Sequence, residues 1–247
     1  MCTLTFIARK RGFALGMNRD EKLARVAALP PLIGPAGGRR ALFPSEPGGG
    51  TWIGVIDTGV CFALINWYAI KTQVSGPSVS RGEVVRSALA ADAPGAAAKI
   101  LGGLPLNRVN PFRLLGFFPA GRNMIEWRWN LKALEPLRHP WETKHWISSG
   151  FDEPGAQQSR GQTFAAALRQ PSAGGLAWLR RLHRSHEPAC GPYSTCMHRA
   201  DAATVSYTEV IVSARAAKMH YHSGPPCAQA KCFDLNLGLI ATIRSQP

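Results

Sequence analysis

The sequence predicts a layered α+β domain, and three observations carry that prediction. Apolar segments rich in β-forming residues open the chain, helical periodicity dominates its middle, and alternating segments return near its end. An order of strands, helices and strands is typical of α+β folds. The 247 residues suffice for one large domain or two small ones, and no low-complexity linker divides them. We therefore assign residues 1–247 to a single domain.

A β-hairpin is predicted for the first 21 residues. Two apolar segments, residues 1–8 and 13–17, flank a charged turn that ends at Gly12, which is the pattern of two paired strands. Pairing of these strands would bring the polar residues after the second strand close to Cys2. These residues are Asn18, Arg19 and Asp20.

The next segment mixes weak and strong signals. A short helix is predicted for residues 21–26, and a long irregular connection for residues 28–50, which are rich in proline and glycine. Two nearly continuous apolar segments, residues 51–56 and 60–66, indicate strands that are buried on both faces.

Helices are expected in the middle of the chain and strands after them. Ser80 and Glu83 have the spacing of a capping box at the start of a helix. The predicted helices cover residues 81–91, 96–101, 157–170 and 175–186. The predicted strands cover residues 114–118, 124–130, 145–150, 204–214 and 218–223, and residues 233–240 give a mixed signal.

The net charge of +14 favours an anionic partner. We do not expect a nucleic-acid-binding protein, because no helix-turn-helix, zinc-finger or RNP pattern accompanies the charge. A carboxylate, a phosphate or a porphyrin with propionates would be attracted by the positive electrostatic field of such a protein. No apolar segment approaches the ~20 residues of a membrane helix and no secretory signal is visible, so we expect a soluble, cytoplasmic protein with reduced thiols.

Cys2 is a candidate nucleophile if Met1 is removed. The residue would then carry a thiol and a free amine, and the amine could take the thiol proton and later protonate a leaving group. The alternative is a small buried apolar residue near a chain end. Retention of Met1 would block the free-amine mechanism.

Several segments together resemble the NRDE family, also called the transport and Golgi organisation 2 family. They are Met1-Cys2-Thr3, Asn18-Arg19-Asp20-Glu21, residues 49–55, Ser80-Arg81-Gly82 and Asn110-Pro111-Phe112. The resemblance is strong over the first half of the chain and implies the N-terminal-nucleophile hydrolase fold, a four-layer αββα sandwich. Family members are linked to haem trafficking and to acyl-CoA or lipid metabolism.

A more distant likeness to choloylglycine hydrolases and penicillin V acylases implies roles for individual residues. Cys2 would be the nucleophile, Asp20 the group that orients its amine, and Asn66 the oxyanion donor. The remaining residues are assigned to substrate binding. They are Asn18, Arg19, Glu21, Arg199 and Ser149, which stands where those hydrolases carry an amide.

Two functions follow as hypotheses. The first is an amidohydrolase-like enzyme that cleaves a non-peptide C–N bond of an anionic small molecule and requires no cofactor. The second is a non-catalytic protein that binds haem or an acyl-CoA in the same pocket. We assign no metal site, because the spacings Cys190-x5-Cys196 and Cys227-x4-Cys232 do not match standard zinc pairs.

Overall fold

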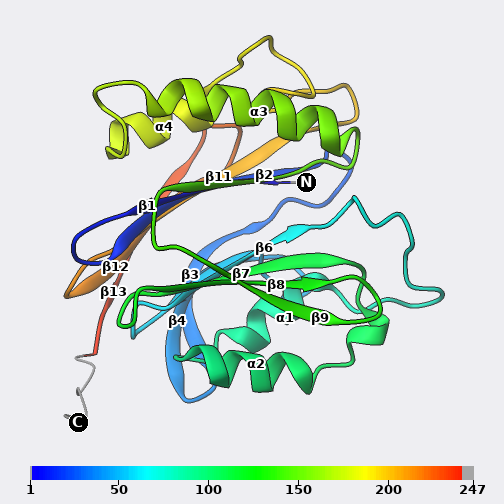
Figure 1. Cartoon of the computed structure of the whole chain (residues 1–247), viewed down its shortest axis with the longest axis vertical. Coiled ribbons are helices and arrows are strands. Elements are labelled where there is room, and N and C mark those ends of the chain that lie inside the picture. Colours follow the sequence, from blue (N-terminus) through cyan, green and yellow to red (C-terminus); the bar gives the residue numbers. More distant parts are fainter. Residues whose placement is uncertain (1, 241–247) are drawn as a thin grey trace.

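Two antiparallel β-sheets face each other, and helices cover both outer faces, which gives the order helix, sheet, sheet, helix (Figure 1). The computed structural model describes residues 2–240. Helices α3 (Glu153–Leu168) and α4 (Leu176–Arg184) cover the six-stranded sheet. Helices α1 (Arg81–Ala88) and α2 (Pro94–Gly102) cover the seven-stranded sheet. The four-layer αββα sandwich is therefore confirmed.

The six-stranded sheet contains both ends of the described chain and has the order β10-β1-β2-β11-β12-β13. Its strands are β1 (Cys2–Ala8), β2 (Phe13–Lys22), β10 (Lys144–Ser148), β11 (Ala202–Val212), β12 (Ala216–His222) and β13 (Cys232–Gly238). The chain thus closes this sheet by adding late strands on both sides of the opening hairpin.

The seven-stranded sheet follows the chain order from β3 to β9. Its strands are β3 (Leu29–Ala36), β4 (Arg39–Ser45), β5 (Ile53–Ile56), β6 (Cys61–Asn66), β7 (Phe112–Phe118), β8 (Asn123–Trp129) and β9 (Leu134–His139). Consecutive strands are neighbours throughout, so the sheet is a meander interrupted by α1, α2 and the 3₁₀ turn Leu106–Arg108.

The opening hairpin forms as predicted, and its register is decisive for the site. Cys2 pairs with Arg19, and Thr3 pairs with Asn18. The turn is closed by Gly12, whose φ of 84° favours glycine. A side chain there would also collide with the backbone of Val212 in β11. Residues 17 positions apart in sequence are therefore held side by side.

The prediction of an irregular connection over residues 28–50 is wrong. This segment forms the hairpin of β3 and β4, joined by Gly37 and Gly38, which both have positive φ as a two-residue hairpin loop requires. Prolines are tolerated in β3 because it is the edge strand of its sheet, where an N–H group can be dispensed with.

The predicted helix over residues 21–26 is also absent. Strand β2 continues to Lys22 because it lies between β1 and β11, and Asp20, Glu21 and Lys22 pair with Thr204, Ala203 and Ala202. Strand β9 was not predicted, because it is an exposed edge strand with little apolar alternation. Among the described residues, no helix has the length and apolar character needed to cross a bilayer.

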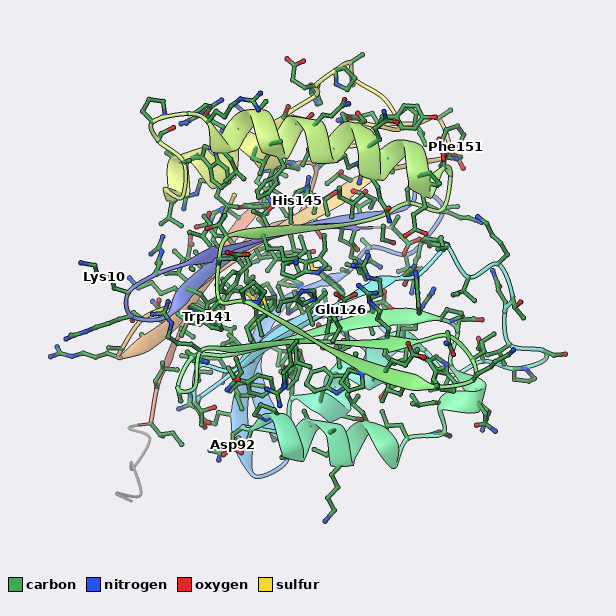
Figure 2. The ribbon with its side chains drawn as sticks, in the orientation of Figure 1. Lys10, Asp92, Glu126, Trp141, His145 and Phe151 are labelled. Atoms are coloured by element: carbon green, nitrogen blue, oxygen red, sulfur yellow. The ribbon has the colours of Figure 1, made fainter. Side chains whose placement is uncertain are left out.

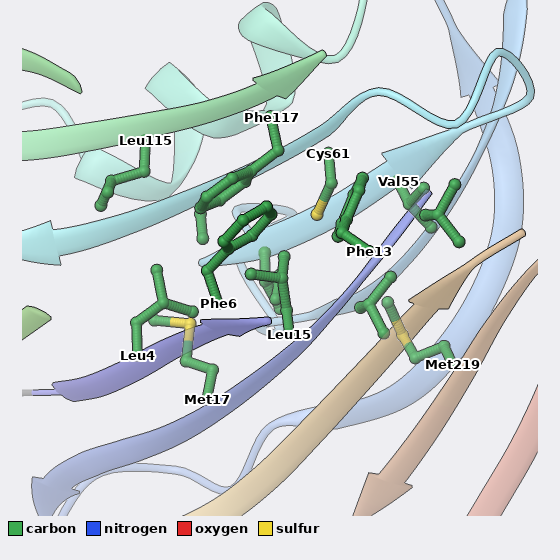
Figure 3. Close-up of a cluster of buried hydrophobic side chains, with 14 of the residues drawn as sticks. Leu4, Phe6, Phe13, Leu15, Met17, Val55, Cys61, Leu115, Phe117 and Met219 are labelled. Carbon is green, nitrogen blue, oxygen red and sulfur yellow. The ribbon is translucent and has the colours of Figure 1, made fainter. Parts of the chain in front are cut away.

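The main hydrophobic core lies between the two sheets (Figure 3). Alternate residues of the opening hairpin enter it from one side, among them Leu4, Phe6 and Leu15, and residues of the facing sheet such as Cys61 and Phe117 enter it from the other. The rings of Phe6 and Phe117 stack with centroids 5.1 Å apart. This core fixes the hairpin rigidly against the second sheet.

Candidate active site

A cavity of about 340 Å³ is lined by residues of both sheets and by the start of α1. It includes Cys2 from β1, Arg19 from β2 and Asn66 from the end of β6. The predicted site residues found in its wall are Cys2, Arg19, Asp20, Glu21 and Asn66. These come from three strands that the sequence separates by up to 64 positions.

Cys2 is almost completely buried at one end of β1, between Arg19 of β2 and Ser148 of β10. Burial raises the pKa of the Cys2 thiol above its ordinary value, and the nearby negative charge of Asp20 adds to the rise. Arg19 and a hydrogen bond from the Asp20 backbone act in the opposite direction. The thiol is therefore protonated at neutral pH and needs a base to become a nucleophile.

The four residues from Asn18 to Glu21 serve two faces of the sheet, because side chains alternate along a strand. The side chains of Asn18 and Asp20 point to the helical layer, where they contact residues of α3, α4 and the loop before β11. Arg19 and Glu21 point to the cavity side and share one ion-pair network. These four residues, called the tetrad below, therefore connect the cavity to the helical layer on the other face of the sheet.

Asp20 is fully enclosed on the helix side of β2. Its carboxylate forms an ion pair with Arg160 of α3 at 3.1 Å and accepts a hydrogen bond from the Thr204 hydroxyl at 2.7 Å. Arg160 also donates to the hydroxyl of Thr3 at 2.7 Å and is itself completely buried. Asp20 is thus held by groups from α3 and β11 directly behind Cys2.

The positive charge of Arg19 is compensated by acidic neighbours. Its guanidinium lies 2.6 Å from a carboxylate oxygen of Glu46 and 3.4 Å from one of Glu21, and it stacks on the ring of Trp52. Arg25 bridges the same two glutamates at 2.7 and 2.8 Å. Two arginines and two glutamates cancel, so this side of the cavity carries no net charge.

Arg81, the first residue of α1, is a wall residue that the sequence analysis did not assign to the site. One of its nitrogens donates to the Pro111 carbonyl at 3.3 Å, and it forms no ion pair with any residue between 2 and 240. Burial lowers its pKa from the usual arginine value. The signal was the Ser80-Arg81-Gly82 motif, which contributed to the family resemblance but received no role.

Close backbone contact positions α1 against the opposite wall. A Cβ on Gly82 would lie 2.9 Å from both the Gly50 Cα and the Thr51 nitrogen, closer than such atoms approach. Ser80 caps the helix by accepting from the Gly82 N–H at 3.2 Å. The paired glycines therefore let the start of α1, with Arg81, reach the cavity.

Asn66 stands at the end of β6, where the apolar strand meets the cavity. Its side-chain amide donates to the Tyr68 hydroxyl at 2.7 Å. An amide N–H on a cavity wall can donate to a developing oxyanion, and a tyrosine beside it fixes its orientation.

The model of the family described as "Transport and Golgi organisation 2" matches residues 1–170, which is more than half of the chain. The chain belongs to the transport and Golgi organisation 2 family. The resemblance inferred from the tetrad and the opening Met-Cys is therefore confirmed. No protein with a curated description matches this family member significantly.

Solved structures with the same architecture are N-terminal-nucleophile hydrolases. One is a Cys2-to-Ala mutant of the conjugated bile acid hydrolase from Clostridium perfringens, with a TM-score of 0.59 and 8% identity over 95% of this chain and 92% of that chain. Another is penicillin V acylase from Agrobacterium tumefaciens, with a TM-score of 0.56 and 11% identity over 96% and 86% of the two chains. At these identities the likeness establishes the fold of this family member.

Three residues assigned to substrate binding lie outside the cavity wall in this member of the family. Asn18 is fully buried, and its amide donates to the backbone carbonyls of His183 and Thr195 at 2.9 and 2.8 Å. Ser149 is buried beside the end of β10, where its hydroxyl accepts from the Phe151 N–H. Arg199 pairs with Asp201. Their position outside the cavity wall does not test their assignment to substrate binding, which stays a prediction.

Proposed function

We propose that this protein is a cysteine-dependent amidohydrolase that cleaves a C–N bond of an anionic small molecule after Met1 has been removed. One observation carries the proposal: Cys2, Asn66 and Arg81 line the same cavity in a fold shared with N-terminal-nucleophile hydrolases. Together they provide a nucleophile, an amide donor and a cation.

The first step is attack of the Cys2 sulfur on the substrate carbonyl carbon. The raised pKa of the thiol means that a base must remove its proton, and the free α-amine of Cys2 is the base closest to it. The proton then passes to the leaving nitrogen as the C–N bond breaks, which leaves a thioester on Cys2. Water, activated by the same amine, hydrolyses the thioester and restores the thiol.

Asn66 and Asp20 assist this chemistry in different ways. The Asn66 amide would donate to the carbonyl oxygen as negative charge develops there, in exchange for its hydrogen bond to Tyr68. Asp20 acts from behind the strand as a positioning residue, because its carboxylate is tied to Arg160 and Thr204. Its charge would also favour the protonated form of the amine during turnover.

The anionic group of the substrate is assigned to Arg81. The likeness to choloylglycine hydrolases and penicillin V acylases implies this role for Arg19, but Glu46 and Glu21 compensate the charge of Arg19. Arg81 faces the same cavity with a carbonyl as its hydrogen-bond partner and no acidic partner among residues 2–240. A carboxylate or phosphate of the substrate would complete its coordination.

Release of amine from a panel of linear N-acyl amides, with and without a carboxylate, tests the proposal. The expected result is turnover of at least one carboxylate-bearing amide, lost by at least ~1,000-fold in Cys2→Ala because the covalent step is removed. Cys232→Ala, a change at an exposed cysteine outside the cavity, is the matched control and should keep full activity.

The carrier hypothesis predicts a different pattern in the same samples. No amide would be turned over, and haem or an acyl-CoA would raise the melting temperature of the Cys2→Ala variant as much as that of the unmodified protein. That combination would replace the enzymatic proposal with a binding function.

A further inference from the structure

Four side chains outside the cavity converge on one point near the six-stranded sheet. His186 follows α4, Cys196 and His198 precede β11, and Cys227 lies in the loop between β12 and β13. Their ligand atoms, two imidazole nitrogens and two sulfurs, all lie within 4.8 Å of one another. None of these four residues belongs to the cavity or to the family-matched residues 1–170.

We propose that these four residues form a structural site for zinc or a zinc-like divalent metal ion. Two cysteines and two histidines are a ligand set typical of closed, tetrahedral zinc sites. Two thiolates would also balance the two charges of the ion, which suits the complete burial of Cys196. With four protein ligands no position stays open for a substrate, so the ion would be structural.

The three ligand distances at His198 agree with the edges of such a tetrahedron, and the remaining pairs lie within 4.8 Å. Bond lengths of about 2.05 Å to nitrogen and about 2.3 Å to sulfur imply separations of about 3.3 Å between nitrogens and about 3.6 Å between nitrogen and sulfur. The Nε2 atoms of His186 and His198 are 3.3 Å apart. The Nε2 atom of His198 lies 3.6 Å from the sulfur of Cys196 and 3.4 Å from that of Cys227.

Hydrogen bonding alone does not account for this convergence. The Nε2 atom of His198 has three neighbours within these distances, yet a neutral imidazole nitrogen either donates one hydrogen bond or accepts one. A metal ion satisfies all four atoms at once. The other cysteines and histidines of the region are not part of this cluster: His220 pairs with Asp234, His222 contacts the Gly224 carbonyl, and Cys190 and Cys232 lie outside the four converging residues.

The site would fasten the loop that supports the tetrad from behind. Met197 lies between the ligands Cys196 and His198 and forms two hydrogen bonds with Thr204. The Met197 N–H donates to the Thr204 hydroxyl at 2.9 Å, and the Thr204 N–H donates to the Met197 carbonyl at 2.8 Å. The same hydroxyl donates to Asp20. The carbonyl of Thr195, next to Cys196, accepts from Asn18. The metal would therefore hold the backbone that positions Asn18 and Asp20.

Metal content and cobalt substitution test the proposal without any activity measurement. Protein purified under reducing conditions without chelator should contain about one zinc ion per chain. After removal of the metal, Co²⁺ should produce the visible bands of a tetrahedral site together with a thiolate charge-transfer band. Cys2→Ala should bind metal normally, so the result is independent of the proposed catalysis.

Cys196→Ser and Cys227→Ser should each weaken Co²⁺ binding by at least ~100-fold. Loss of a residue that only supports a metal ligand already lowers metal affinity by up to about 100-fold, and loss of a ligand itself should cost at least as much. Cys190→Ser, in the same loop, is the matched control and should bind cobalt like the unmodified protein. If a cysteine variant fails to fold, competition between the unmodified apoprotein and a zinc-chelating dye still measures affinity. Folded, reduced protein that gives no cobalt spectrum, or a Cys196–Cys227 disulfide in place of metal, would overturn the proposal.

Discussion

Glu46 and Glu21 decide which arginine of the cavity is available to a ligand. Their carboxylates hold Arg19 and Arg25 in a closed network of four charges. A substrate anion at Arg19 would have to displace a hydrogen-bonded glutamate from a site where both are largely buried. Arg81 needs no such exchange, because its partner is a backbone carbonyl. Charge compensation, rather than position alone, is therefore the reason for proposing Arg81 as the anion-binding residue.

Arg81→Ala should raise KM for a carboxylate-bearing amide by about 10- to 100-fold, because a hydrogen bond between charged groups contributes about 1.5–3 kcal/mol. The value of kcat should change much less, since Arg81 binds the group that does not react. Steady-state kinetics with a matched pair of substrates, one with and one without the carboxylate, measure the effect.

Arg108→Ala is the control for that experiment, because Arg108 is exposed and lies outside the cavity. An equal loss for both substrates, or the same loss in the Arg108 variant, would show that Arg81 does not bind the anionic group.

At the scale of elements, a buried polar network ties the opening hairpin to the helical layer. The Thr5 hydroxyl of β1 lies 2.8 Å from Nδ1 of His145 and 2.9 Å from Nε2 of His183. The other nitrogen of His183 lies 3.0 Å from the Asn18 side-chain oxygen. His145 lies just beneath α3 in Figure 2, where its ring stacks on Phe164. Both imidazoles are therefore held neutral between sheet and helices.

Acid should weaken this junction. Burial lowers the pKa of His145 to about 3, with a further contribution from Arg160, and burial also holds the pKa of His183 well below its ordinary value. An unfolded histidine titrates near ~6.5. Between about pH 6.5 and pH 3 the unfolded chain therefore binds more protons than the folded chain. The stabilising contribution is complete above pH 6.5 and is lost as pH falls through this window.

The free energy of unfolding should accordingly fall by up to about 1.4 kcal/mol per pH unit for each of these histidines. Urea unfolding at several pH values between 7 and 4 measures the slope. His145→Gln should flatten it relative to the unmodified protein, because the substitution removes one histidine whose pKa burial depresses. An unchanged slope in His145→Gln would mean that this residue is protonated in the folded state.

At the scale of the whole molecule, local patterns predicted the strands with strong apolar periodicity and failed at both edges of the seven-stranded sheet. The opening hairpin and the strands β5 and β6 carry their own signal. Strands β3 and β9 contain prolines and exposed residues that only an edge position permits, and that position depends on the rest of the sheet.

The site shows the same division between local and long-range information. The register of one hairpin was enough to place Cys2 beside Arg19. Because side chains alternate along a strand, the sequence already places Asn18 and Asp20 on the face opposite Arg19. The alternation does not say which of the two faces meets the cavity. The roles of Glu46 and Arg81, and the meeting of His186 with Cys227, depend on segments brought together only by the folded sheets.

The central claim is that Cys2 becomes the N-terminal nucleophile of this fold. Mass spectrometry of the N-terminal peptide, after incubation of the protein with a thiol-reactive amide or β-lactam probe, tests it most directly. We predict a peptide that begins at Cys2 and carries the probe, with labelling faster than at the other five cysteines. Retention of Met1, or labelling without preference for Cys2, would contradict the account.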